Sequence, residues 1–588
     1  MPSLFQRGPL VERLRSAWLS ASNPLAWQAD ARRFAASYLL LLPFYLAPLF
    51  APRFLPGLDL PFHLSMVDML SKVHRPDSPY AAFYDGSPML APYAAHYLAL
   101  WLLGKVMAIA TAHKLIIVAY VAALPLAASS LLAVCGRSRV PALLAFPLAY
   151  NLTLHYGFVS SALSLPVVLV LLAQLTRFLV APRPEAVRWL ATACAAMLLF
   201  LCHLQNFLYG VCAVLAFVIF AETTLLRRVL GAATLAPALG ALAFWQVRTK
   251  FDDGADPQRK TLAFAWNALR AARRGDLGGG RRPLILDLRE RLNDLPSHAL
   301  RAFTDAIDRR ACRTLMVLLL VYFCLGVAGW LAQRRQGIPA PLAPGEQPPR
   351  MGFALWVSFL GALAAYLALP HHLPVFEIMT FYPRFAPLAL AMMIPLIPAG
   401  LERLPPGVRA LLPLPAVLFC ALYGRELYRH YRLYAEETAD FVAVLDRAEP
   451  GHKALGLVFD RQSRVMHIES AFIGTPNFYA VAKPAPGTMV PLAYCGLRHM
   501  PCRRKPALAS MPDPGAWTPD HFEPDRSLTF FDYFFVRSPP PGNLFGRQQP
   551  VVELVAHQGT WWLWRRKPGV ALVPPPPPPP SPEPDYDD

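Results

Sequence analysis

Long apolar runs, separated by short polar segments, fill the chain from residue 34 to residue 424. A helix that crosses a bilayer needs about 20 mostly apolar residues, and eleven runs have roughly that length. They cover residues 34–51, 115–134, 140–156, 159–176, 189–204, 207–226, 229–247, 315–331, 351–369, 385–401 and 408–423. The pattern therefore predicts an all-α polytopic membrane bundle of about eleven transmembrane helices.

Composition supports a membrane protein. Of the 588 residues, 55% are hydrophobic and only 16% are charged, which is too little polar surface for a soluble globule of this size. The formal charge of +18 is concentrated in short loops and in residues 248–310. Such charge orients a membrane protein and attracts anionic headgroups. We find no nucleic-acid-binding motif, so the expected partner is the lipid bilayer and no nucleic acid is expected.

The basic loops also decide the topology, because cytoplasmic loops collect Lys and Arg. A further run, residues 91–111, is long enough to span but carries His96 and Lys105. If it lies at the outer interface instead, every short basic loop faces the cytoplasm. We therefore expect residues 1–33 to be cytoplasmic, residues 52–113 to form the first outer loop, and residues 248–312 to form a long outer loop.

The pattern changes after residue 424. Residues 425–448 predict an amphipathic helix, and residues 454–460, 531–537 and 551–566 predict strands between loops rich in Pro and Gly. We expect a small extracytoplasmic α/β or α+β domain over residues 425–570, in which Cys495 and Cys502 could pair. The Pro-rich, acidic residues 571–588 predict a disordered tail.

Four polar segments fall on the outer side in this topology. Ionisable groups at membrane depth are costly and commonly functional, so four of them at one level predict the lining of a substrate-binding cavity. The alternative is that they are interfacial anchors or satisfied core groups. The candidate residues are Asp59 and His63 in "DLPFHL"; Asn151 and His155 in "NLTLHYGF"; His203 and Asn206 in "CHLQN"; and His371, Glu377, Tyr382 and Arg384 in "HHLPVFEIMTFYPRF".

Asp59 is the candidate with the clearest chemistry. If Pro61 begins a helix, Asp59 is its N-cap and His63 lies about one turn further on. The carboxylate could simply cap the helix. It could instead deprotonate an acceptor hydroxyl or hold a divalent ion together with His63. Arg384 suits a lipid-linked phosphate, or it is an interfacial anchor.

The segments "DLPFHL", "FPLAYNLTLHYGFVSSALSLP", "LFLCHLQNF" and "YPRFAPLALAMMIPLIP" resemble those of a group of bacterial polytopic membrane proteins. The layout resembles the GT-C superfamily of integral-membrane glycosyltransferases. This resemblance implies transfer of a sugar from a polyprenyl-phosphate donor at the outer face of a bacterial inner membrane. It also implies that Asp59 is the catalytic base or a metal-linked anchor. Many members have two adjacent acids there, whereas Leu60 follows Asp59, so His63 would share the work.

Two other classes of protein fit the sequence. A transporter or flippase of envelope precursors predicts polar clusters at mid-depth and repeated halves, whereas these clusters lie at one end and no repeat is found. A catalytically inactive membrane scaffold, whose outer domain binds envelope partners, is favoured by the single acid at Asp59, where many GT-C members have two adjacent acids.

Overall fold

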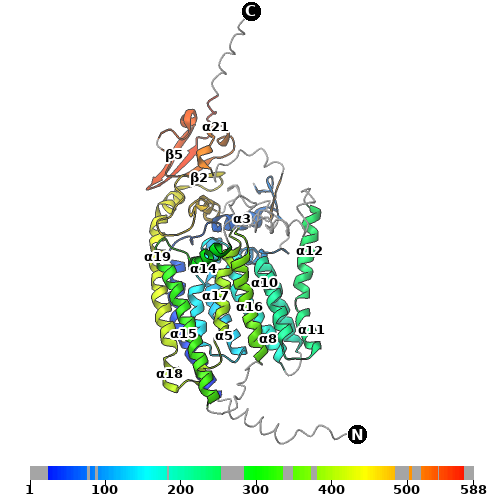
Figure 1. Ribbon diagram of the computed structural model, residues 1–588. Coiled ribbons are helices and arrows are strands. Elements are labelled where there is room, and N and C mark those ends of the chain that lie inside the picture. Colours follow the sequence, from blue (N-terminus) through cyan, green and yellow to red (C-terminus); the bar gives the residue numbers. More distant parts are fainter. Residues whose placement is uncertain are drawn as a thin grey trace, which may run out of the picture.

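The computed structural model describes residues 24–75, 78, 80–86, 90–181, 185–252, 284–335, 349–371, 380–483, 502–505, 518–540 and 542–574. Most of these residues are helical, and a small sheet lies at one end of the helical bundle (Figure 1).

Seven helical stretches within the described residues have the length and apolarity to cross a membrane. Apolar side chains remain exposed along them: Leu39 is 65% exposed, Leu320 is 60% exposed and Leu418 is 57% exposed. Such faces suit lipid rather than water, so the chain has the features of a multi-pass membrane protein. The stretches contain α2 (Pro24–Leu46), α5 (Ile109–Val134), α8 (Val159–Val180), α11 (Leu225–Ala233) with α12 (Ala236–Asp252), α15 (Ile307–Arg335), α17 (Phe385–Met393), and α18 (Pro406–Leu411) with α19 (Pro413–Arg447).

The other four predicted spans coincide with shorter apolar helices. Three of them are α9 (Ala186–Cys202), α10 (Leu204–Phe220) and α16 (Pro349–Ala368). The run 140–156, which we expected to be one helix, is divided into η2 (Val140–Leu144), α6 (Ala145–Leu148) and α7 (Leu152–His155). Pro141 and Pro147 lack the amide that a continuous helix needs, and the Asn151 side chain accepts a hydrogen bond from the Leu154 amide and starts a new helix.

Two short helices lie between α2 and α5. They are α3 (Leu60–Lys72) and α4 (Ala94–Leu103). The ten residues of α4 reach about 15 Å, half the thickness of a bilayer core, so α4 cannot cross a membrane by itself. α3 lies at the end of the bundle that carries the sheet (Figure 1), and it contacts α20 (Phe478–Ala482).

The sheet has four strands in the order β2 (Ala454–Val458), β4 (Tyr533–Arg537), β6 (Trp561–Arg566) and β5 (Val552–Gln558). β2 is parallel to β4, and the other pairs are antiparallel. The strands predicted from the sequence are confirmed. α19 has 35 residues and is about 52 Å long, which exceeds the roughly 30 Å bilayer core. It therefore continues from the bundle to the sheet as one helix (Figure 1).

Three segments that are distant in sequence meet at this end of the bundle. β1 (Tyr84–Gly86) pairs with β3 (Cys502–Arg504) of the C-terminal domain. The Thr304 amide donates to the Val465 carbonyl over 2.9 Å, and the His467 amide donates to the Ala302 carbonyl over 2.8 Å. The predicted first outer loop, the described end of the predicted long outer loop and the C-terminal domain therefore lie on one side. Three predictions fall outside the described residues. They are the bridge between Cys495 and Cys502, because Cys495 is not described, the place of Glu377, and the tail beyond Pro574.

Candidate functional site

Asp59 lies at the N-cap position of α3, as the sequence predicts, but its side chain makes no capping hydrogen bond. The backbone fixes its position instead. The Asp59 amide donates to the Tyr156 carbonyl over 3.0 Å, and the Asp59 carbonyl accepts from the His63 amide over 3.1 Å. A helix cap is therefore not what holds this carboxylate, which is only partly buried.

Gly157 allows this backbone contact. It has a φ of +88°, and a Cβ atom at this position would lie 2.5 Å from the Leu60 amide nitrogen and 2.9 Å from that of Asp59. Only a residue without a side chain permits so close an approach in this conformation. The "HYGF" segment therefore packs directly against the start of "DLPFHL".

Arg384 joins two further segments to the same place. Its guanidinium lies over the Phe158 ring, 3.9 Å from the centroid, and its Nη1 atom is 3.5 Å from Nε2 of His203. Arg384 also interacts electrostatically with Asp59. A carboxylate and a guanidinium from opposite ends of the bundle sequence thus act on each other at the end that carries the sheet.

His63 and Tyr97 extend this group. Their Nδ1 and Oη atoms share a hydrogen bond of 2.6 Å. Burial raises the pKa of the Tyr97 phenol, and the negative charge of Asp59 raises it further, so the phenol stays protonated. We call Asp59, His63, Tyr97, His203 and Arg384 the bundle-end cluster.

A pair of buried histidines, His96 and His113, lies near His63. Nε2 of His96 is 3.4 Å from Nδ1 of His113, and both side chains are nearly inaccessible. Burial lowers the pKa of His96, and the neighbouring His113 and His63 lower it further. The sequence reasoning used His96 only for topology and missed Tyr97 and His113, because a polar residue inside an apolar run does not reveal its partner.

His203 and Asn206 shape the ends of their helices. His203 caps α10 by accepting from the Asn206 amide over 3.4 Å. The Asn206 side chain donates to the Ser164 hydroxyl, and the neighbouring Gln205 amide donates to the Phe381 carbonyl over 3.2 Å. Of these two candidates, His203 contacts Arg384, while Asn206 binds α8 in the interior.

Asn151 and His155 are fully buried. The Asn151 amide donates to the Tyr120 hydroxyl over 2.9 Å. The His155 ring contacts the Asn151 carbonyl over 2.9 Å and the Tyr431 hydroxyl over 3.2 Å. These side chains are satisfied inside the core, and their segment instead reaches the bundle-end cluster through Tyr156, Gly157 and Phe158.

Tyr382 belongs to a separate aromatic group. Its ring centroid is 5.4 Å from those of Tyr366 and His298 and 5.7 Å from that of His371. The Arg291 guanidinium lies 4.2 Å from its centroid. This group packs α14 (Leu284–Leu300) against α16. Tyr382 and His371 come from the same predicted segment as Arg384, but they contact a different set of side chains.

The C-terminal domain contributes a carboxylate that the sequence reasoning missed. Burial raises the pKa of Tyr156, and the negative charges of Glu469 and Asp59 both raise it further. Glu469 is exposed and therefore available near the same tyrosine as Asp59. Its loop has no recognisable motif, and only the docking of the domain brings it here.

Within the described residues, no group of three or more His, Cys, Asp or Glu side chains is arranged to hold a metal ion. Asp59 and His63 are two candidate ligands. Magnesium commonly binds one or two carboxylates and completes its shell with water and substrate phosphates, so the Asp59 carboxylate fits such an ion only together with substrate. The His63 imidazole is instead a ligand that zinc and other transition metals prefer.

Neither protein-family models nor curated protein sequences match this chain. What the bundle-end cluster can do is therefore inferred from its own chemistry.

Proposed function

We propose that the protein is a membrane glycosyltransferase of the GT-C type, which uses a polyprenyl-phosphate sugar at the outer face of a bacterial inner membrane. The observation that carries this proposal is that Asp59 and Arg384 are both held at the segment 156–158: the Asp59 amide donates to the Tyr156 carbonyl, and the Arg384 guanidinium lies over the Phe158 ring. It occurs at the end of the bundle where two short helices and the C-terminal domain meet. An amphiphilic lipid-linked donor and a polar acceptor can both arrive at such a boundary.

The two side chains have complementary roles in transfer. The Asp59 carboxylate takes the proton of an acceptor hydroxyl, and the hydroxyl oxygen forms a bond to the anomeric carbon of the donor sugar. The bond between that carbon and the phosphate oxygen breaks, and its electron pair stays on the phosphate. The Arg384 guanidinium stabilises the phosphate charge with paired N–H donors. A divalent ion held by Asp59, His63 and the donor phosphate would add to this stabilisation.

His63 acts as a positioning residue in this scheme. Its hydrogen bond to Tyr97 fixes the imidazole of a residue that lies one helical turn from Asp59. His203 does the same for Arg384 through their 3.5 Å contact. Asp59, which has no second acid next to it in the sequence, is thereby set in a polar group that a scaffold would not require.

The proposed topology includes all eleven predicted spans, four of which coincide with shorter apolar helices. The C-terminal domain is then extracytoplasmic. The basic short loops support this orientation, as does the meeting of residues 52–113, 284–312 and the C-terminal domain at one end.

The test is transfer of a labelled sugar from polyprenyl-phosphate donors to envelope lipid extracts in proteoliposomes. Asp59→Asn should reduce transfer about 100-fold or more, because the amide cannot act as a base, while the melting temperature stays unchanged. Arg384→Lys should reduce transfer about ten-fold through loss of paired phosphate contacts. Asp294→Asn, a change at an exposed carboxylate of α14, serves as the control. Full transfer by Asp59→Asn would exclude Asp59 as the base, and absence of transfer by the parent protein would favour a scaffold or a transporter.

A further inference from the structure

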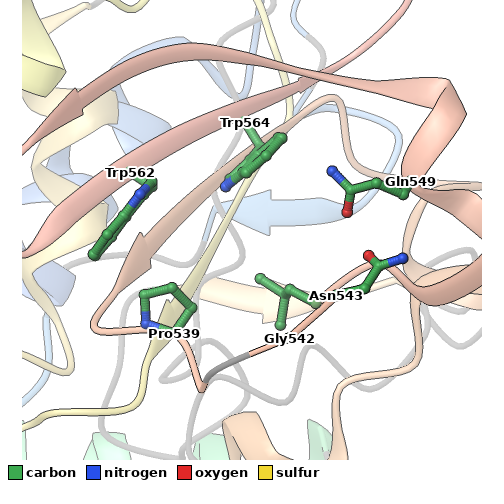
Figure 2. Close-up of a pocket in the computed structure, with 7 residues that line it drawn as sticks. Pro539, Gly542, Asn543, Gln549, Trp562 and Trp564 are labelled. Carbon is green, nitrogen blue, oxygen red and sulfur yellow. The ribbon is translucent and has the colours of Figure 1, made fainter.

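A pocket of about 400 Å³ lies in the C-terminal domain, far along the chain from the bundle-end cluster. Two tryptophans of β6, Trp562 and Trp564, form one wall, and Pro539, Asn543 and Gln549 lie around them (Figure 2). The volume falls within the range of pockets that hold small ligands. Nothing in the proposed transfer reaction uses these residues.

The strand pattern explains why the two indoles share one wall. Residues two apart on a strand point to the same face. Trp561 and Leu563 point the other way and are fully buried, and the Trp561 ring lies 4.9 Å from that of Phe441 on α19. Trp562 and Trp564 therefore occupy the face turned away from α19, where both are only partly buried.

Neighbouring rings hold both indoles in place. The His557 imidazole stacks on Trp562 with a centroid distance of 4.3 Å and an angle of 15°. Phe545 meets Trp564 at 5.5 Å and 61°. A wall that is already oriented loses little side-chain entropy when a ligand binds.

Two amide side chains give the pocket a polar side. Asn543 donates from Nδ2 to the Gly546 carbonyl over 2.7 Å, which fixes the amide and leaves its Oδ1 atom as an acceptor. The side-chain amide of Gln549 makes no hydrogen bond to another residue that the structure describes. Figure 2 shows both amides across from Trp564. The pocket thus combines flat aromatic faces with groups that can both accept and donate.

We propose that this pocket binds a saccharide chain. A pyranose ring offers C–H bonds with partial positive charge, which pack on the negative face of an indole. Its hydroxyls can donate to Asn543 Oδ1 and accept from the Gln549 amide. This site is independent of Asp59 and goes beyond the proposed function, because a protein without transferase activity would still bind glycan through it.

The other chemistry that favours an aromatic pocket is a polyproline segment. The chain carries one directly after the domain, at residues 574–580. Proline has no amide N–H, so a polyproline segment has no donor for the Asn543 acceptor. The amide side of the pocket therefore favours the saccharide.

The full-length protein in nanodiscs is titrated by calorimetry with cellotetraose, chitotetraose, mannotetraose and a heptaproline peptide. At least one tetrasaccharide should bind with a Kd below ~1 mM. Trp562→Ala should weaken that binding about ten-fold or more, and Gln549→Ala should weaken it about three-fold. Gln558→Ala, at an exposed glutamine of β5, is the matched control and should bind like the parent.

Binding of no tetrasaccharide would overturn the proposal, as would sugar binding that Trp562→Ala and Gln549→Ala leave unchanged. Binding of heptaproline alone, lost in Trp562→Ala, would make the pocket a polyproline site instead. Because Gln549 is only partly buried and lies outside the strands, its substitution tests the pocket even if Trp562→Ala disturbs β6. Sugar transfer is measured on the same protein. It distinguishes loss of saccharide binding in the pocket from failure of the proposed transfer reaction at Asp59.

Discussion

Gly157 controls how closely two segments of the bundle-end cluster approach each other. Its φ of +88° is a conformation that L-residues with side chains rarely adopt, and the atoms that a Cβ would meet belong to the backbone of Asp59 and Leu60. A backbone cannot turn aside as a flexible side chain can. A substitution here must therefore move the start of α3, and with it the Asp59 carboxylate.

We expect Gly157→Ala to destabilise the protein by about 3 kcal/mol or more and to lower sugar transfer. The control is Gly569→Ala, where φ is +72° but no atom lies within 4 Å of the added Cβ. That change should cost only the conformational strain, about 1–2 kcal/mol. Thermal unfolding in detergent measures both. Equal losses in the two variants would show that the contact with α3 has no importance.

Single residues also show which parts of the site could be predicted. Asp59 and Arg384 were found because a charge at the end of an apolar run is costly wherever it lies. Asn151 and His155 have the same costly character, yet their partners Tyr120 and Tyr431 are distant in sequence. Composition cannot distinguish a polar group satisfied in the core from one that lines a site. Glu469 could not be found because its place depends on domain docking.

Among the elements, α14 connects the predicted long outer loop to the bundle. The Arg291 side chain donates to the carbonyls of Leu367 and Leu369 near the end of α16, and His298 shares a 2.9 Å hydrogen bond with the Tyr366 hydroxyl. The sequence predicted a long outer loop over residues 248–312 here. Its periodicity could predict α14, whereas these contacts with α16 come from the packing of the whole bundle.

This packing predicts a dependence of stability on pH. Burial lowers the pKa of His298 to about 4, and the nearby positive charges of His371, Arg301 and Arg291 lower it further. In the unfolded chain its pKa is about 6.5, so the unfolded state binds more protons between these values. The free energy of unfolding should therefore fall as the pH drops from about 6.5 to 4.

His298→Gln keeps a donor for Tyr366 but does not titrate. Its melting temperature should fall less than that of the parent between pH 7 and pH 5, as measured by intrinsic fluorescence in detergent. His521→Gln, at an exposed histidine of the C-terminal domain, should follow the parent. If all three proteins lose the same amount, the docking of α14 does not depend on a neutral His298.

The broken run at residues 140–156 shows the limit of hydropathy at this scale. The apolar composition is correct for a span, but Pro141, Pro147 and the capping side chain of Asn151 divide it into three pieces. The turn between the last piece and α8 is what brings Tyr156 and Gly157 to Asp59. An apolar run therefore predicts burial more reliably than it predicts a continuous helix.

At the scale of the whole molecule, α19 links the bundle to the sheet without interruption. The side on which α19 ends is therefore the side of the C-terminal domain, of α3 and of the bundle-end cluster. Basic residues lie at the opposite end of the bundle. Arg137 donates to the Ile397 carbonyl, and Arg177 donates to the Ser130 hydroxyl over 2.7 Å. By the positive-inside tendency, the proposed topology places that opposite end in the cytoplasm.

This orientation predicts the behaviour of reporter fusions. Alkaline phosphatase, which is active only where disulfides form, should be active when fused after Arg447 at the end of α19. The same enzyme fused after Arg335 at the end of α15 should be inactive, and a fluorescent protein that needs the cytoplasm should give the reverse pattern at both sites. If the phosphatase is active only after Arg335, the bundle-end cluster faces the cytoplasm. A polyprenyl-phosphate donor on the outer leaflet could then not reach Asp59, and the proposed transfer would fail on topology even if every contact in the cluster is correct.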